Sequence, residues 1–117
     1  MMTSIEESIN ILSSFLHNEY DVEVRLEESA DNAYFPSIAV VEIDSSMGLE
    51  ERYHTLLHEA SHVILHPNTS EEHAWLFAEQ VVESLNLHSL TENFLRLKKE
   101  SIQSYLNNKL QEKTHEG

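Results

Sequence analysis

Three residues near the middle of the chain have the types and spacing of a metal-dependent hydrolase site. His58, Glu59 and His62 form an H-E-x-x-H motif within the run YHTLLHEASHVILHP. Residues four apart lie on one face of a helix, so the two imidazoles can bind a single ion. Glu59 lies about 100° around the helix from His58, within reach of a water molecule near that ion. The pattern is typical of zinc peptidases, in which this glutamate is the general base.

The alternative explanation of the motif is an amphipathic helix with two solvated histidines. Apolar residues surround the motif, which predicts a largely buried helix: Leu56, Leu57, Ala60, Val63, Ile64 and Leu65. A buried His or Glu must be paired or metal-bound, because an unpaired buried polar or charged group costs several kcal/mol. We therefore favour a metal site. The motif leads us to expect Zn²⁺ there. Because the chain has no cysteine, His and carboxylate groups must hold the ion, and this ligand set suits a catalytic site better than a structural one.

A catalytic zinc usually has three protein ligands and one open position, so a third ligand is needed. The candidates that follow the motif are His66, Glu71, Glu72, His73 and Glu79. A helical projection of residues 71–85 places Glu71 within the apolar stripe, with Glu72 and Glu79 toward its edge. The alternative role for Glu71 is to stabilise a helix start through the macrodipole. His66 would lie about 6 Å further along the motif helix, so we expect it to cap or hydrogen-bond near the helix end.

The length and charge of the chain limit the number of domains and the kinds of partner that we expect. At 117 residues, we expect one domain spanning residues 1–117. The net charge of −14, from seven basic and 21 acidic residues, argues against direct nucleic-acid binding. The acidic surface favours a basic protein partner, although solubility alone also explains it. The first residues, MMTSIEES, have neither a basic nor a long apolar segment, so we expect no signal peptide, no membrane span and a cytoplasmic protein.

Hydrophobic periodicity predicts an α+β fold around the motif helix. We expect helices over residues 4–17, 49–66, 70–85 and 90–109, with Ser4, Thr69 and Ser89 as the caps of the first and the last two. Alternating residues 21–27 and the β-branched and aromatic run 34–43 predict two or three short antiparallel strands, with Pro36 at an edge or a strand start. The expected order is an N-terminal helix, a small antiparallel β-sheet, the HExxH helix, and two further helices.

The motif region resembles the ImmA/IrrE family of small metallopeptidases from bacteria and mobile elements such as phages. That family has T-x-x-H-E-x-G-H on one helix and E-x-x-A-N-x-F-A on the next. The matching residues here are Thr55, His58, Glu59, His62, Glu71, Ala74, Phe77 and Ala78. The resemblance covers roughly residues 36–85; Ser61 replaces the usual Gly, and Trp75 replaces the usual Asn or Asp. It implies a minimal, gluzincin-like zincin domain with His58, His62 and Glu71 as zinc ligands.

The expected function is zinc-dependent hydrolysis of a peptide bond, with Glu59 moving the proton. The resemblance implies a protein substrate such as a DNA-binding repressor. The alternative is a non-catalytic zinc-containing protein that sequesters a regulatory partner. We expect the substrate to add as a strand along residues 37–43. Candidates for stabilising the oxyanion are Tyr53, His54, His73 and His88.

Overall fold

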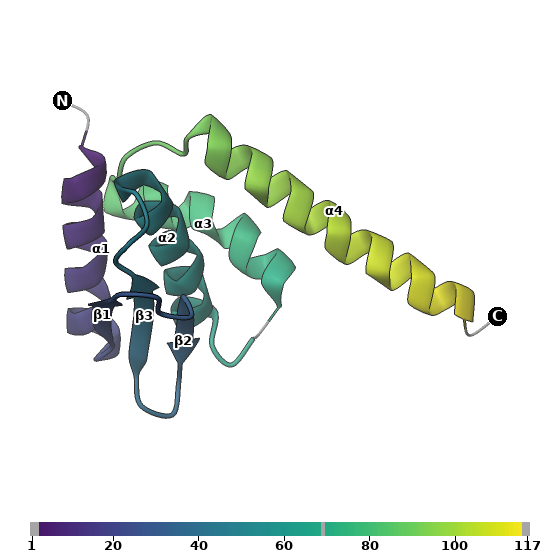
Figure 1. Cartoon of the computed structure of the whole chain (residues 1–117), viewed down its shortest axis with the longest axis horizontal. Coiled ribbons are helices and arrows are strands. Elements are labelled where there is room, and N and C mark those ends of the chain that lie inside the picture. Colours follow the sequence, from purple (N-terminus) through teal and green to yellow (C-terminus); the bar gives the residue numbers. More distant parts are fainter. Residues whose placement is uncertain (1–2, 69, 116–117) are drawn as a thin grey trace.

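The computed structural model describes residues 3–68 and 70–115, which form four helices and three strands (Figure 1). In chain order these are α1 (Ile5–Tyr20), β1 (Glu23–Glu27), β2 (Ala33–Phe35), β3 (Val40–Asp44), α2 (Leu49–Leu65), α3 (Glu71–Leu85) and α4 (Glu92–His115). The predicted α+β class and the predicted order of elements are confirmed. None of the helices in the described part of the chain combines the length and apolar character needed to cross a membrane.

The sheet is mixed, which corrects the expectation of purely antiparallel strands. Its order is β1-β3-β2, with β3 parallel to β1 and antiparallel to β2. The number of strands, three, agrees with the expected two or three, and the run 34–43 provides two of them, joined by a turn. Pro36 has a fixed φ and no N–H to donate to a ladder, and Ala39 has a left-handed φ of 54°. The chain therefore reverses after β2, and β3 returns between β2 and β1.

The position of β3 also corrects the expected substrate strand. Residues 40–43 lie in the centre of the sheet, where β1 occupies one side and β2 the other. No backbone edge of β3 is free to accept a further strand over these residues. Within the described sheet, β2 is the edge strand next to α2, as Figure 1 shows.

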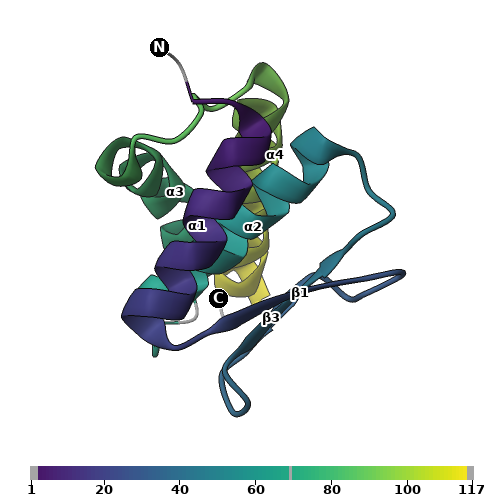
Figure 2. The same cartoon turned by 90° about the vertical axis from the view of Figure 1, so that its left-hand side faces the viewer.

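The core forms around α2, whose apolar side chains contact α1, α3 and the sheet. Figure 2 shows α1 lying across α2, with β1 and β3 below the pair. The core residues include Leu12 and Leu16 of α1, Val41 and Ile43 of β3, Tyr53, Leu56, Leu57, Ala60 and Val63 of α2, Ala78 and Val81 of α3, and Phe94 of α4. Contact on three sides fixes how far α2 can rotate or slide, and this holds the motif in place.

The helix caps explain where the helices begin. As predicted, Ser4 caps α1, its Oγ accepting from the Glu7 N–H at 3.1 Å. The cap of α3 is Ser70, whose Oγ accepts from the His73 N–H at 3.3 Å; the expected cap, Thr69, lies outside the described residues. At α4, Thr91 replaces the expected Ser89, its Oγ1 accepting from the Phe94 N–H at 3.2 Å.

Candidate metal centre

Helix α2 presents the two motif histidines on one face, one turn apart. Their Nε2 atoms are 3.3 Å apart, and their rings are nearly perpendicular, at 89°. Both side chains are mostly buried, with 15% of His58 and 14% of His62 exposed. Neighbouring Leu57 and Ala60 are fully buried, so the apolar face of α2 is anchored in the core. The histidines therefore lie at the border between core and solvent.

Glu71, the first residue of α3, completes the group. Its Oε2 lies 2.8 Å from His58 Nε2, and its Oε1 lies 3.0 Å from His62 Nε2. Just before α3, the Asn68 Oδ1 accepts a hydrogen bond from the Ser70 N–H at 2.9 Å. The side chain of Glu71 is 60% exposed, so it approaches the histidines from the solvent side and does not enter the core. The helical projection predicts correctly that the side chain of Glu71 faces α2, but this side chain is more exposed than a position within the apolar stripe implies.

The other candidate ligands lie elsewhere. Within residues 3–68 and 70–115, His58, His62 and Glu71 form the one group of three or more such residues whose ligand atoms converge, all within 4.8 Å of one another. Glu79 pairs with a lysine instead, its Oε2 lying 3.9 Å from Lys98 Nζ. His66 ends α2, as expected, and its ring meets that of Tyr34 edge-on at 6.1 Å.

The donor atoms fit a small divalent cation. With metal–ligand distances of about 2.0–2.1 Å, a tetrahedral ion separates its ligand atoms by about 3.3 Å. The separations here are 2.8, 3.0 and 3.3 Å. Burial lowers the pKa of His58, and the negative charge of Glu71 opposes that shift. A lowered pKa favours the neutral imidazole, which is the form that binds a metal.

Glu59 lies in a different environment from Glu71. It is only 8% exposed, and burial raises its pKa to about 7, with a further contribution from the charge of Glu71. A backbone hydrogen bond with Tyr34 opposes the shift. A carboxyl group whose pKa lies near neutrality can both accept and return a proton at physiological pH.

A cavity of about 330 Å³ opens beside these groups. Its lining residues come from β2 and the turn after it, from α2, and from the start of α3: Ala33, Tyr34, Pro36, Glu59, His62, His66, Asn68 and Glu71. Tyr34 and Asn68 were not expected from the sequence. Tyr34 comes near the motif because of the order of the strands, and Asn68 because it lies between α2 and α3. Hydrophobic periodicity in the sequence predicts neither position.

The four residues expected as oxyanion donors have other partners. The Tyr53 hydroxyl is buried and donates to the His88 carbonyl oxygen. His54 Nε2 lies 2.7 Å from Thr91 Oγ1, and His73 Nδ1 lies 3.1 Å from the Asn68 amide nitrogen. None of the four lines the 330 Å³ cavity. Tyr34 and His66, which do line it, are better placed as donors.

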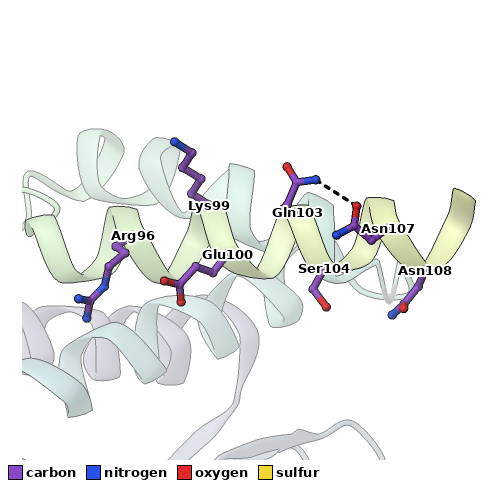
Figure 3. Close-up of a pocket in the computed structure, with 7 residues that line it drawn as sticks. All are labelled: Arg96, Lys99, Glu100, Gln103, Ser104, Asn107 and Asn108. Atoms are coloured by element: carbon purple, nitrogen blue, oxygen red, sulfur yellow. Dashed lines mark hydrogen bonds between the residues drawn. The ribbon is translucent and has the colours of Figure 1, made fainter.

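A second hollow, of about 650 Å³, lies along α4, and Figure 3 shows that every residue lining it belongs to that one helix. The lining residues are Arg96, Lys99, Glu100, Gln103, Ser104, Asn107 and Asn108. One helix provides no opposing wall, so this hollow is the exposed polar surface of α4. The cavity beside the histidines is therefore the candidate site.

Comparisons of this chain with protein-family models, with curated proteins and with solved structures give no match.

Proposed function

We propose that the chain is a zinc-dependent peptidase that hydrolyses a peptide bond in a protein substrate. The observation that carries the proposal is the convergence of His58, His62 and Glu71, with Glu59 lining the same cavity. Three protein ligands and an open fourth position are the usual composition of a catalytic zinc site. The resemblance of the motif region to the ImmA/IrrE family, which includes these same residues, agrees with the proposal. A cytoplasmic location is part of the proposal.

In the proposed mechanism, His58, His62 and Glu71 would hold the ion. Zinc in this position supplies Lewis acidity, which acidifies water and polarises a carbonyl group. Glu59 takes the proton from the attacking water and later delivers it to the leaving amine. Burial of Glu59 suits both steps, since it raises the carboxyl pKa to about 7.

The substrate would bind along the edge of β2. Ala33 and Tyr34 of this strand line the cavity. Within the described sheet β2 pairs with β3 along one edge, and its other edge has no neighbouring strand. An extended segment paired with β2 would gain backbone hydrogen bonds and pass its carbonyl groups beside His62 and Glu59. The net charge of −14 would favour a basic segment, such as one from a DNA-binding repressor.

The test is a comparison of the wild type with Glu59→Gln, using Glu72→Gln as the matched control. Each zinc-loaded protein is incubated with a library of basic peptides, and products are identified by mass spectrometry. Glu59→Gln should retain zinc but cleave more slowly by about 10²–10⁴-fold, because the general base is lost. Glu72→Gln should cleave as the wild type does, since its carboxylate is outside the metal group.

A different outcome would favour a different function. A wild-type protein that holds zinc and retains peptides without cutting any would contradict the peptidase proposal. It would favour a zinc-containing protein that sequesters its partner. Equal cleavage by the wild type and Glu59→Gln would remove Glu59 from the mechanism.

A further inference from the structure

His58 lacks the support that a metal-binding histidine usually has. Such a residue commonly donates its second ring N–H to a carboxylate, a carbonyl or a water, and this hydrogen bond fixes the orientation of the ring. His58 directs Nε2 toward Glu71, which leaves Nδ1 for that role. Nδ1 is buried and has no hydrogen-bond partner among the residues that the structure describes. Something else must therefore keep this imidazole in position.

Trp75 lies directly against the ring of His58. The two ring centroids are 4.5 Å apart, with an angle of 40° between the ring planes. Trp75 follows Glu71 by four residues on α3, so both side chains lie on the face of the helix that meets the histidines. The indole also packs on Phe94, at 5.3 Å between centroids, and Phe94 is fully buried. Trp75 therefore contacts both His58 and Phe94, a residue in the first turn of α4.

We infer that Trp75 is a positioning residue that holds the metal ligand His58 by close, tilted contact between the two rings, in place of a hydrogen bond to Nδ1. This inference rests on the proposed metal site. An imidazole between a rigid indole and Glu71 can turn only a little, so its Nε2 stays directed at the ion position.

The first test measures zinc affinity against a competing chelator. Trp75→Ala should weaken zinc binding by about 10–100-fold, the usual effect of losing a group that orients a metal ligand. Trp75→Phe, which keeps an aromatic ring against His58, should recover most of the affinity. Leu76→Ala is the surface control, because Leu76 is the next residue on α3 and is 47% exposed.

A purely structural role for Trp75 predicts a different pattern. Phe94→Leu loosens the packing of Trp75 on α4 without removing the ring that contacts His58. If Trp75 only joins α3 to α4, both Trp75→Ala and Phe94→Leu should lower the melting temperature and leave zinc affinity unchanged. If Trp75 positions His58, zinc affinity should fall for Trp75→Ala by at least several times more than for Phe94→Leu.

The second test uses fluorescence, because Trp75 is the only tryptophan in the chain. Zinc added to the wild type should change the emission of Trp75 and saturate at one equivalent, since His58 changes its bonding directly against the indole. His58→Ala should abolish the change, and this result does not depend on how well Trp75→Ala folds. The positioning role alone would be overturned if the wild type binds one zinc with no change in emission. It would also be overturned if folded Trp75→Ala binds zinc with the same affinity as the wild type. A wild type that binds no zinc would overturn the metal site and this inference together.

Discussion

At the residue scale, two glutamates near the same histidines have opposite environments. Glu59 is 8% exposed and has its pKa raised to about 7, whereas the side chain of Glu71 is 60% exposed. The buried carboxyl is suited to moving a proton, and the exposed one approaches both imidazoles as a charged ligand would. The two side chains have the same chemistry, so the two roles proposed for them would follow from their burial and direction.

The ligand role of Glu71 can be separated from a helix-start role. Glu71 and Glu72 are both in the first turn of α3, so a macrodipole effect would make them nearly equivalent, within about 1 kcal/mol. Glu71→Ala should weaken zinc binding by well over the about 10–100-fold that is typical of losing a residue that only orients a metal ligand, because it removes a direct ligand. Glu72→Ala should leave the affinity close to that of the wild type. Zinc titration against a chelator measures both, and equal affinities would refute the ligand assignment.

At the element scale, the beginning of α4 is attached to α2 through His54. Its ring lies 5.1 Å from that of Phe94, and its Nε2 lies 2.7 Å from Thr91 Oγ1. Thr91 also caps α4, so one hydroxyl serves both contacts. Burial lowers the pKa of His54, and the nearby charges of Glu50 and Glu51 oppose that shift.

This attachment should make stability depend on pH. Because the pKa of His54 is lower in the folded state, His54 binds a proton more readily in the unfolded chain. The contribution of His54 to the free energy of unfolding is therefore complete above about pH 6.5, the unfolded-state pKa, and is lost as the pH falls through the folded-state pKa. The free energy of unfolding should fall less between about pH 7.5 and about pH 5 in His54→Gln than in the wild type. Denaturant titration measures this, with His17→Gln at an exposed site as the control. An identical pH dependence in the wild type and His54→Gln would contradict the role of His54.

The sequence predicts the helices well and the sheet poorly, for physical reasons. Apolar residues at helical spacing and local capping residues such as Ser4 act within a few positions, so the positions of α1 to α4 follow from local patterns. The turn between Phe35 and Val40 lies inside the β-branched and aromatic run 34–43, where Pro36 signals a strand edge but no periodicity shows where the next strand begins. The parallel pairing of β1 with β3 depends on contacts between distant residues. Tyr34 lies on β2, opposite Val41 of β3, and reaches the cavity because β2 is the edge strand next to α2. That order of strands has no signal in the local sequence.

At the scale of the whole molecule, charge is unevenly distributed along the chain. Residues 1–91 have 17 acidic side chains and only Arg25 and Arg52 as basic ones, whereas α4 contains the other five basic residues. Beyond its first turns α4 extends away from the other elements (Figure 1). The part of the molecule that holds the cavity is therefore strongly acidic. This charge would attract basic protein segments and repel nucleic acids.

We propose that this molecule holds a metal ion between α2 and α3, and the zinc content of the purified protein is the sharpest test. Protein stripped with a chelator, dialysed against zinc and measured by elemental analysis should contain about one zinc per chain, as a three-ligand catalytic site requires. His58→Ala and His62→Ala should each reduce that content to near zero, and zinc should raise the melting temperature of the wild type alone, because it binds only the folded state. No zinc uptake by the wild type, or full uptake by either histidine variant, would contradict the account.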